Sequence, residues 1–282
     1  MTPLRPRNVI YKRAVPGIEQ VPNQFKPVQN FRYPADNSHA FERWYLDTFL
    51  STDKTARMYL PVQWTAFYCN NRFGQDKQAI SQLQRFLDTL DRTKPYYTIV
   101  QFDDGILNNI DHLDLKIFSM GGGRVDYPIP LLCIPHKFHA NVPRETFASF
   151  IGRETHTLRK SVFELSGKPG YYISQKPHSL SEYTEHMHRS VFSLAVRGYG
   201  VTSFRIAEAI HAGSIPVYIS DQHCLPYNMP FDYGLILGPQ DDIDAAMQAA
   251  DVRALQSRVR DVRELFTYQG CKNMILKELR NE

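Results

Sequence analysis

The residues from Arg197 to Glu208 are the part of the sequence best suited to chemistry. They read R-G-Y-G-V-T-S-F-R-I-A-E, so that Gly198 and Gly200 flank Tyr199. Glycine lets the backbone turn tightly and lets a ligand approach it closely. We therefore expect a ligand to meet the chain at this turn.

The helix expected after this turn can bind an anion. Thr202 or Ser203 can cap it, and its first turn offers backbone N–H groups and the positive end of the helix dipole. Arg205 adds a positive charge, and Glu208 on the same face can accept hydrogen bonds from ribose hydroxyls. The segment predicts a site for the phosphates of a nucleotide. The alternative is an ordinary turn with an Arg–Glu pair on its surface.

A dinucleotide-binding turn is a second interpretation of these residues. G-Y-G-V-T-S is a variant of G-x-G-x-x-G, and Asp221 follows at about the distance at which such a fingerprint places its ribose-binding carboxylate. However, the unit begins late in the chain, and charged residues at Arg205 and Glu208 differ from the close packing that a third glycine permits. An NAD-binding oxidoreductase therefore remains an alternative.

Two carboxylates earlier in the chain are candidates for a general base. Asp103 and Asp104 come directly after an apolar run that we expect to be a strand, at the carboxyl edge where α/β proteins build their sites. The alternative is an Asp-Gly turn beside a strand. His39, His136 and His139 are further candidates.

Metal and P-loop motifs are weak in this sequence. Asp242 and Asp244 form a D-x-D pattern, but they open a helical run, where acidic residues suit the helix dipole. The histidine pairs at 136/139 and 186/188 lack a third ligand at a convincing spacing. The run M-G-G-G-R-V-D-Y-P contains no G-K-[ST], so we expect a loop between strands there.

The elements that position these residues alternate between strand and helix. In the first half, we expect strands over 56–62, 96–102, 115–118 and 129–135 and helices over 40–50 and 78–90. In the second half, we expect strands over 147–151, 171–175, 192–196, 215–220 and 235–237 and helices over 155–165, 182–189, 203–212, 252–266 and 273–279. This alternation predicts parallel α/β sheets in two lobes, residues 1–141 and residues 142–282.

Composition excludes several classes of protein. With 282 residues, 43% of them hydrophobic, the chain can bury a core, and its net charge of +4 comes from interspersed charges that do not indicate nucleic-acid binding. The cysteines at 69, 133, 224 and 271 form no C-x-x-C pair and predict reduced thiols. The sequence has no signal-peptide pattern and no apolar run of membrane-spanning length, so we expect a soluble cytoplasmic protein.

The residues from Ser190 to Pro226 follow the pattern S-x-F-x-L-x-x-R-G-Y-G-x-x-S-x-R-x-x-E-A-I-x-x-G-x-I-P-V-x-I-x-D-x-x-x-L-P. This pattern resembles the C-terminal signature of exostosin-like glycosyltransferases, glycosyltransferase family 47. A weaker likeness includes Phe150, Gly152 and Arg159. The N-terminal anchor common in Golgi members is absent from this sequence, so it looks like a compact soluble form, as relatives from algal viruses or bacteria can be.

The resemblance implies two Rossmann-like lobes that face each other across a cleft, the GT-B arrangement. It implies inverting transfer of a sugar from a UDP-sugar to a glycan acceptor, usually without a metal or other cofactor. Xylose is the first sugar that it suggests, ahead of galactose, glucuronate and arabinose. A non-catalytic glycan-binding protein on the same fold is an alternative.

The resemblance also implies roles for particular residues. Arg159 and Arg205 would neutralise the diphosphate with help from Ser203, and Glu208 would hold the ribose. Asp104 would take the Asp position of the family's H-D-x-G segment, with Asp103 replacing the histidine. The full set of expected donor-binding residues is Gly152, Arg159, Arg197, Gly198, Tyr199, Gly200, Ser203, Arg205 and Glu208.

Overall fold

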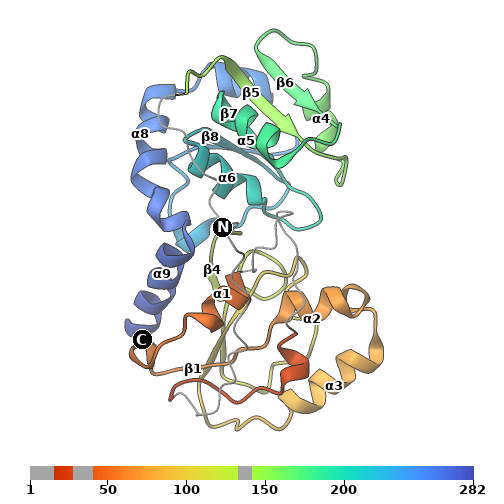
Figure 1. Ribbon diagram of the computed structural model, residues 1–282, viewed down its shortest axis with the longest axis vertical. Helices are drawn as coiled ribbons and strands as arrows, with labels where there is room; N and C mark the ends of the chain where they lie inside the picture. Colours follow the sequence, from red (N-terminus) through yellow and green to blue (C-terminus); the bar gives the residue numbers. More distant parts are fainter. Residues whose placement is uncertain (1–15, 28–40, 133–141) are drawn as a thin grey trace, which may run out of the picture.

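The computed structural model describes residues 16–27, 41–132 and 142–282. The described chain forms two lobes, one above the other along the long axis, and each lobe is built around a parallel β-sheet with helices packed against it (Figure 1). The predicted α/β class with two Rossmann-like lobes is therefore confirmed.

The sheet of the first lobe has four strands within the described residues. In sheet order these are β1 (Met58–Tyr59), β2 (Tyr96–Val100), β3 (Leu115–Ser119) and β4 (Tyr127–Pro128), all parallel. The helices of this lobe are α1 (Phe41–Asp47), α2 (Trp64–Asn70) and α3 (Lys77–Leu87).

Two elements of the first lobe differ from the sequence expectation. The strand predicted over 129–135 is wrong for residues 129–132, because β4 pairs with β3 at Tyr127 and Pro128 and then stops. Pro130 has no N–H with which to extend the ladder at this sheet edge. The sequence does not predict α2, whose aromatic residues are weak helix formers. Trp64 and Tyr68 of α2 are completely buried, so tertiary packing stabilises this helix.

The sheet of the second lobe has five described strands, also all parallel. In sheet order these are β6 (Tyr171–Ser174), β5 (Thr146–Ile151), β7 (Ser190–Val196), β8 (Ile215–Ile219) and β9 (Leu235–Leu237). The helices are α4 (Arg159–Phe163), α5 (Leu180–His188), α6 (Phe204–Ala212) and α7 (Ile243–Gln248). Helix α4 is shorter than the predicted 155–165, because the N–H of Leu158 donates to the His156 ring and residues 157 and 158 form a turn before the helix begins.

Two helices close the chain and connect the lobes. Helix α8 (Val252–Val262) packs on the second lobe, and α9 (Tyr268–Arg280) runs down to the first lobe, where it contacts α1 (Figure 1, blue). The predicted helix over 252–266 thus ends at Val262, and the predicted helix over 273–279 begins earlier, where Thr267 caps it. The predicted division at residue 142 borders residues 133–141, which lie outside the described residues, and it stays a prediction.

One apolar cluster runs through both lobes. It includes Tyr97 and Phe118 of the first sheet and Leu194 and Val217 of the second. Aromatic pairs join the two parts, with the Phe41 and Tyr268 ring centroids 5.4 Å apart. A second cluster lies on the other face of the first sheet, under α2 and α3. The shared core fixes the lobes relative to each other.

Candidate active site

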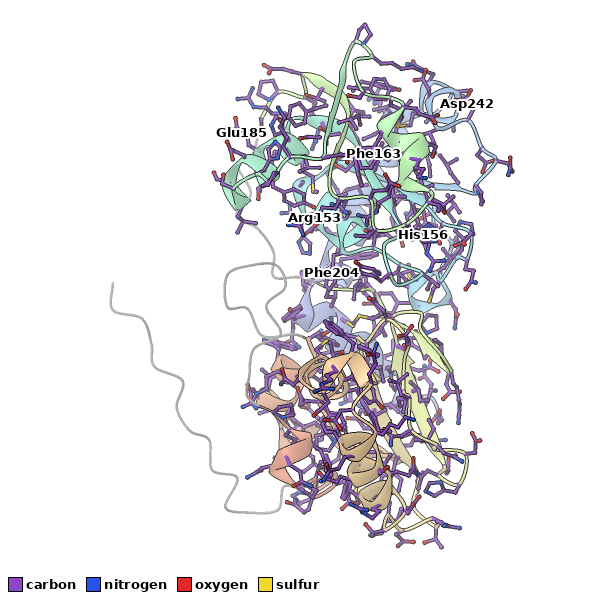
Figure 2. All side chains as sticks on the ribbon, turned by 90° about the vertical axis from the view of Figure 1, so that its right-hand side faces the viewer. Arg153, His156, Phe163, Glu185, Phe204 and Asp242 are labelled. Atoms are coloured by element: carbon purple, nitrogen blue, oxygen red, sulfur yellow. The ribbon has the colours of Figure 1, made fainter. Side chains whose placement is uncertain are left out.

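A pocket of about 500 Å³ lies between the two lobes. This volume suits a small-molecule ligand. In Figure 2, Phe204 lies at the junction of the lobes with Arg153 above it in the second lobe. The pocket is lined by Thr65, Cys69, Phe73, Gln101, Phe102, Asp103 and Leu131 of the first lobe and by Arg153, Thr155, Arg159, Gly198, Tyr199, Gly200, Thr202, Ser203, Phe204 and Arg205 of the second.

The first turn of α6 faces this pocket. Ser203 is the N-cap, and its Oγ accepts a hydrogen bond from the N–H of Arg205 at 3.4 Å. The helix ends at Gly213, which has φ of 66°. Ser203, Phe204 and Arg205 all line the pocket, so the positive end of the helix dipole points into it. The predicted helix unit is confirmed, and Ser203 rather than Thr202 caps it.

Two guanidinium groups of the pocket lining lie over the same aromatic ring, that of Phe150. The Cζ atoms of Arg205 and Arg159 are 4.7 Å and 5.5 Å from the centroid of Phe150. Arg205 also donates to the Ile151 carbonyl. Arg159 donates to the carbonyls of Arg197 and other backbone groups, and it therefore holds the loops at the ends of β5 and β7. Both charges raise the positive potential at the pocket.

Arg197 lies near the pocket but outside its lining. Its guanidinium pairs with the carboxylate of Asp221 and donates to the Tyr199 carbonyl at 3.3 Å. The hydrogen bond from the Arg197 guanidinium to the Asp221 carboxylate lowers the pKa of Asp221. Asp221 was the carboxylate that a dinucleotide-binding turn would need for its ribose. Because it pairs with Arg197 and does not line the pocket, the arrangement disfavours the NAD interpretation.

Asp103 is the carboxylate that the first lobe brings to the pocket. Although it stays exposed, the surrounding wall partly desolvates it, and this burial raises the pKa of Asp103; the charge of Asp104 raises it further, while Arg197 opposes the shift. The loop after β3 can pack against the backbone of Asp103 because it carries glycine. A Cβ at Gly122 would lie 1.9 Å from the Asp103 carbonyl oxygen, so the loop after β3 must carry glycine there.

Asp104 does not line the pocket. Its backbone carbonyl lies against Gly123 in the loop after β3. The expected carboxylate pair is therefore divided, and Asp103 alone of the two faces the ligand space. The reserve candidates His39, His136 and His139 lie outside the described residues.

Gly152 borders a second, smaller hollow, and Glu208 is bonded to another residue of its lining. This hollow has about 250 Å³ and includes Gly152, Arg153, His178 and Tyr183 in its lining. Glu208 is buried, and its carboxylate accepts a hydrogen bond from the Tyr183 hydroxyl. Arg153 lines both hollows, so they adjoin. The expected ribose contact of Glu208 stays a prediction, because Glu208 is buried and lines neither hollow.

The sequence does not predict Arg153 or, apart from Asp103, the residues of the first lobe that line the pocket. Arg153 is exposed, lines both hollows, and takes part in none of the ion pairs found among the described residues. The position of Arg153 directly after the expected turn at Gly152 was the one feature of the sequence that could have predicted its place at the pocket. Nothing in the local sequence marks Thr65 or Gln101, which come to the pocket through the packing of α2 and β2.

A buried glutamate supports that wall. Glu42 of α1 accepts hydrogen bonds from the N–H and Oγ of Thr65 at 3.1 and 2.6 Å and from the N–H of Gln101 at 2.7 Å. Burial raises the pKa of Glu42 to about 7, although these hydrogen bonds oppose the shift. Glu42 thus fixes two pocket-lining residues without touching the pocket itself.

The acidic residues of the D-x-D pattern have other partners. Asp242 caps α7 through the Ala245 N–H, and Asp244 accepts from Tyr171 and Lys168. Figure 2 shows Asp242 near the far end of the second lobe, away from Phe204. Across the ranges that the structure describes, no group of three or more His, Cys, Asp or Glu side chains is placed to hold a metal ion.

The cysteines and the lengths of the helices were also predicted from the sequence. Cys69, Cys224 and Cys271 are free thiols, while Cys133 lies outside the described residues. Within those residues, no helix is both long and apolar enough to span a bilayer.

The two facing α/β lobes define the GT-B arrangement. The family model for the Exostosin GT47 domain matches residues 119–236, which is less than half of the chain. A probable glycosyltransferase of Arabidopsis thaliana is 25% identical over 139 residues, which cover 47% of this chain and 28% of the plant protein. Both agree with the resemblance in the sequence and support an exostosin-like glycosyltransferase.

Two solved structures are loosely similar. A GtfA/B complex has a TM-score of 0.41 and 12% identity, with 89% of this chain and 63% of that chain covered. TarM has a TM-score of 0.44 and 8% identity, with 71% of this chain and 53% of that chain covered. Because both TM-scores are low, we assign the fold from the two parallel sheets alone.

Proposed function

We propose that the protein transfers a sugar from a UDP-sugar to a hydroxyl group of a glycan acceptor, with inversion at the anomeric carbon. One observation carries this proposal. The second lobe presents a helix N-terminus and arginines to the pocket, while the first lobe presents the carboxylate of Asp103 to the same space. An activated, anionic donor and a group that accepts a proton are the two requirements of such a transfer.

The donor diphosphate would lie at the start of α6. There the helix dipole, Arg205 and the exposed Arg153 favour negative charge. The nucleoside would occupy the adjoining hollow beside Tyr183, since Arg153 lines both spaces. Xylose is the first donor sugar to test, followed by galactose, glucuronate and arabinose.

Asp103 would act as the general base. The acceptor oxygen attacks the anomeric carbon, its proton passes to the Asp103 carboxylate, and the bond from the anomeric carbon to the UDP oxygen breaks. The electron pair of that bond leaves on the diphosphate, where the arginines stabilise the developing charge. A raised pKa suits Asp103 to this role, because a stronger base takes the proton more readily.

We further propose that transfer needs no metal ion, since arginines can supply the charge that a divalent cation would otherwise provide. Activity should then persist in EDTA. Loss of activity in EDTA with recovery on addition of Mn²⁺ would contradict this part of the proposal.

Donor binding is the direct test. UDP and a panel of UDP-sugars should raise the melting temperature, and Arg153→Ala should weaken UDP binding while Lys160→Ala, an exposed basic residue of the same lobe outside the pocket lining, should not. Release of UDP in the presence of glycan acceptors would then identify transfer. A protein that binds glycans but neither binds nor turns over any UDP-sugar would be a glycan-binding protein instead.

A further inference from the structure

Two aromatic side chains border the mouth of the pocket, one from each lobe. Tyr199 and Phe73 both line the pocket, yet they are 79% and 68% exposed. These are the highest exposures among the large hydrophobic side chains that the structure describes. Exposed aromatic rings at the entrance of a pocket add little to the core, and two of them at one pocket form an apolar surface suited to contact with a ligand.

The backbone that carries Phe73 is strained. Arg72 and Phe73 are in the left-handed region with φ of 54° and 55°, followed by Gly74 with φ of 80°. Non-glycine residues adopt this region at a cost in free energy, and such strain gathers at functional sites. Because the Phe73 ring is exposed, packing of that ring does not offset the strain.

The strained turn is nevertheless firmly held. The N–H groups of Gly74 and Asp76 both donate to the Asn71 carbonyl, at 3.1 and 3.3 Å. Gly74 also packs closely against Leu107, since a Cβ at Gly74 would lie 2.1 Å from Leu107 Cδ1. The turn therefore holds the backbone from which the Phe73 side chain projects at the pocket.

The chemistry around Phe73 suits a neutral saccharide. The same wall of the pocket carries Thr65 and Gln101. The Thr65 hydroxyl donates its proton to Glu42 but can still accept a hydrogen bond from a sugar hydroxyl, and the Gln101 Nε2 can donate one. Asp103 makes this side unfavourable for the anionic donor, whose phosphates are attracted to the arginines of the other lobe. A sugar ring has an apolar C–H face that can lie on an aromatic ring, with hydroxyl groups around its edge.

We propose that Phe73 positions the glycan acceptor, with its ring against the apolar face of an acceptor sugar and Tyr199 opposite from the second lobe. The inference deepens the proposed function and rests on it: the sugar on Phe73 belongs to the molecule whose hydroxyl Asp103 deprotonates. Phe73 is thus a positioning residue that distinguishes saccharide acceptors from small alcohols or water.

The test compares Phe73→Ala with Phe73→Trp and with Leu50→Ala, an exposed residue that does not line the pocket. In Phe73→Ala, the acceptor KM should rise about three- to tenfold, the range expected for one lost aromatic contact. UDP affinity and acceptor-independent hydrolysis of the UDP-sugar should stay unchanged, and Phe73→Trp should restore acceptor binding. Tyr199→Ala should weaken acceptor binding in the same way.

Two further readouts keep this inference separate from the proposed function. Calorimetric titration with xylotetraose and cellotetraose needs no donor, and the wild-type protein should bind one of them more tightly than Phe73→Ala does. Phe73→Gly should likewise weaken saccharide binding, because it also removes the ring and leaves a residue that adopts the positive φ of this turn. The inference is overturned if neither saccharide binds the wild-type protein, or if Phe73→Ala weakens UDP binding.

Discussion

The carboxylate of Asp103 occupies the space that a side chain at Gly200 would need. A Cβ at position 200 would lie 2.5 Å from Asp103 Oδ1. The two residues come from different lobes, so this contact brings the proposed base against the loop that leads to α6, where we propose that the diphosphate lies. The missing side chain at Gly200 is what allows the approach.

Gly200→Ala should impair catalysis more than folding. The backbone at Gly200 does not have a positive φ, and the atom that it would meet is the end of a side chain that can move away. Displacement of Asp103 by about 1 Å should lower kcat about 10²-fold. Steady-state kinetics and thermal unfolding measure the two effects. Gly238→Ala is the control, since its Cβ would make ordinary contact at 3.6 Å; equal activity of both variants would refute the contact's role.

Asp103→Asn should lower kcat by about 10²- to 10⁴-fold, the range for loss of a general base. In the wild-type protein, kcat/KM should rise with pH through an acid limb above the usual range of an aspartate, because the pKa of Asp103 is raised and only its ionised form accepts the proton. A pH profile of kcat/KM measures this limb.

Asp104→Asn is the matched control for that experiment. It removes a negative charge that raises the pKa of Asp103, so the acid limb should move to lower pH while the rate on the plateau is retained. If Asp104→Asn abolishes transfer and Asp103→Asn does not, the assignment of the base is reversed.

Lys272→Met should destabilise the fold strongly. Lys272 of α9 lies 2.6 Å from an Asp53 carboxylate oxygen and donates to the Thr48 carbonyl at 2.6 Å, with both charged side chains less than a tenth exposed. Its loss leaves the Asp53 charge buried without this partner, which costs about 3 to 5 kcal/mol.

Urea unfolding of Lys272→Met and Arg189→Met provides the comparison. Arg189 forms an exposed pair with Glu145 at 2.7 Å, and its removal should cost about 0 to 1 kcal/mol. Similar unfolding midpoints for the two variants would show that the contact between α9 and the first lobe contributes little.

Glu42 should make stability depend on pH. The folded pKa of about 7 exceeds the ordinary value of 4.5, so the folded state binds the proton more tightly. The contribution of Glu42 to the free energy of unfolding is fully present below about pH 4.5 and is lost as pH rises to about 7. Denaturant unfolding between these pH values measures the slope, which Glu42→Gln should flatten and Glu164→Gln, at an exposed position, should not.

The parts of the site that could be predicted are those that are contiguous in sequence. The cap at Ser203, the helix and the final Gly213 depend on neighbouring residues, and the pattern that forms them is local. Asp103 could be placed because residues after a parallel strand fall at a known sheet edge. Where the structure depends on local turn chemistry, the sequence predicts it correctly.

The rest of the site depends on contacts between distant segments. No spacing in the sequence links Glu42 to Thr65 and Gln101, and nothing near Phe73 shows that its ring stays exposed on a strained turn. Similarly, the burial of Glu208 behind Tyr183 follows from the packing of α5 on α6. These features require the packed molecule.

The return of α9 to the first lobe has a consequence for biosynthesis. Lys272 bonds to Thr48 across 224 positions of the chain, so a ribosome makes the first sheet long before the helix that neutralises Asp53. Until then, the early half of the molecule carries an unmatched charge and an uncovered aromatic surface around Phe41. We expect a fragment that stops before Thr267 to require a chaperone or to aggregate, whereas the 282-residue chain, in which α9 is present, should not.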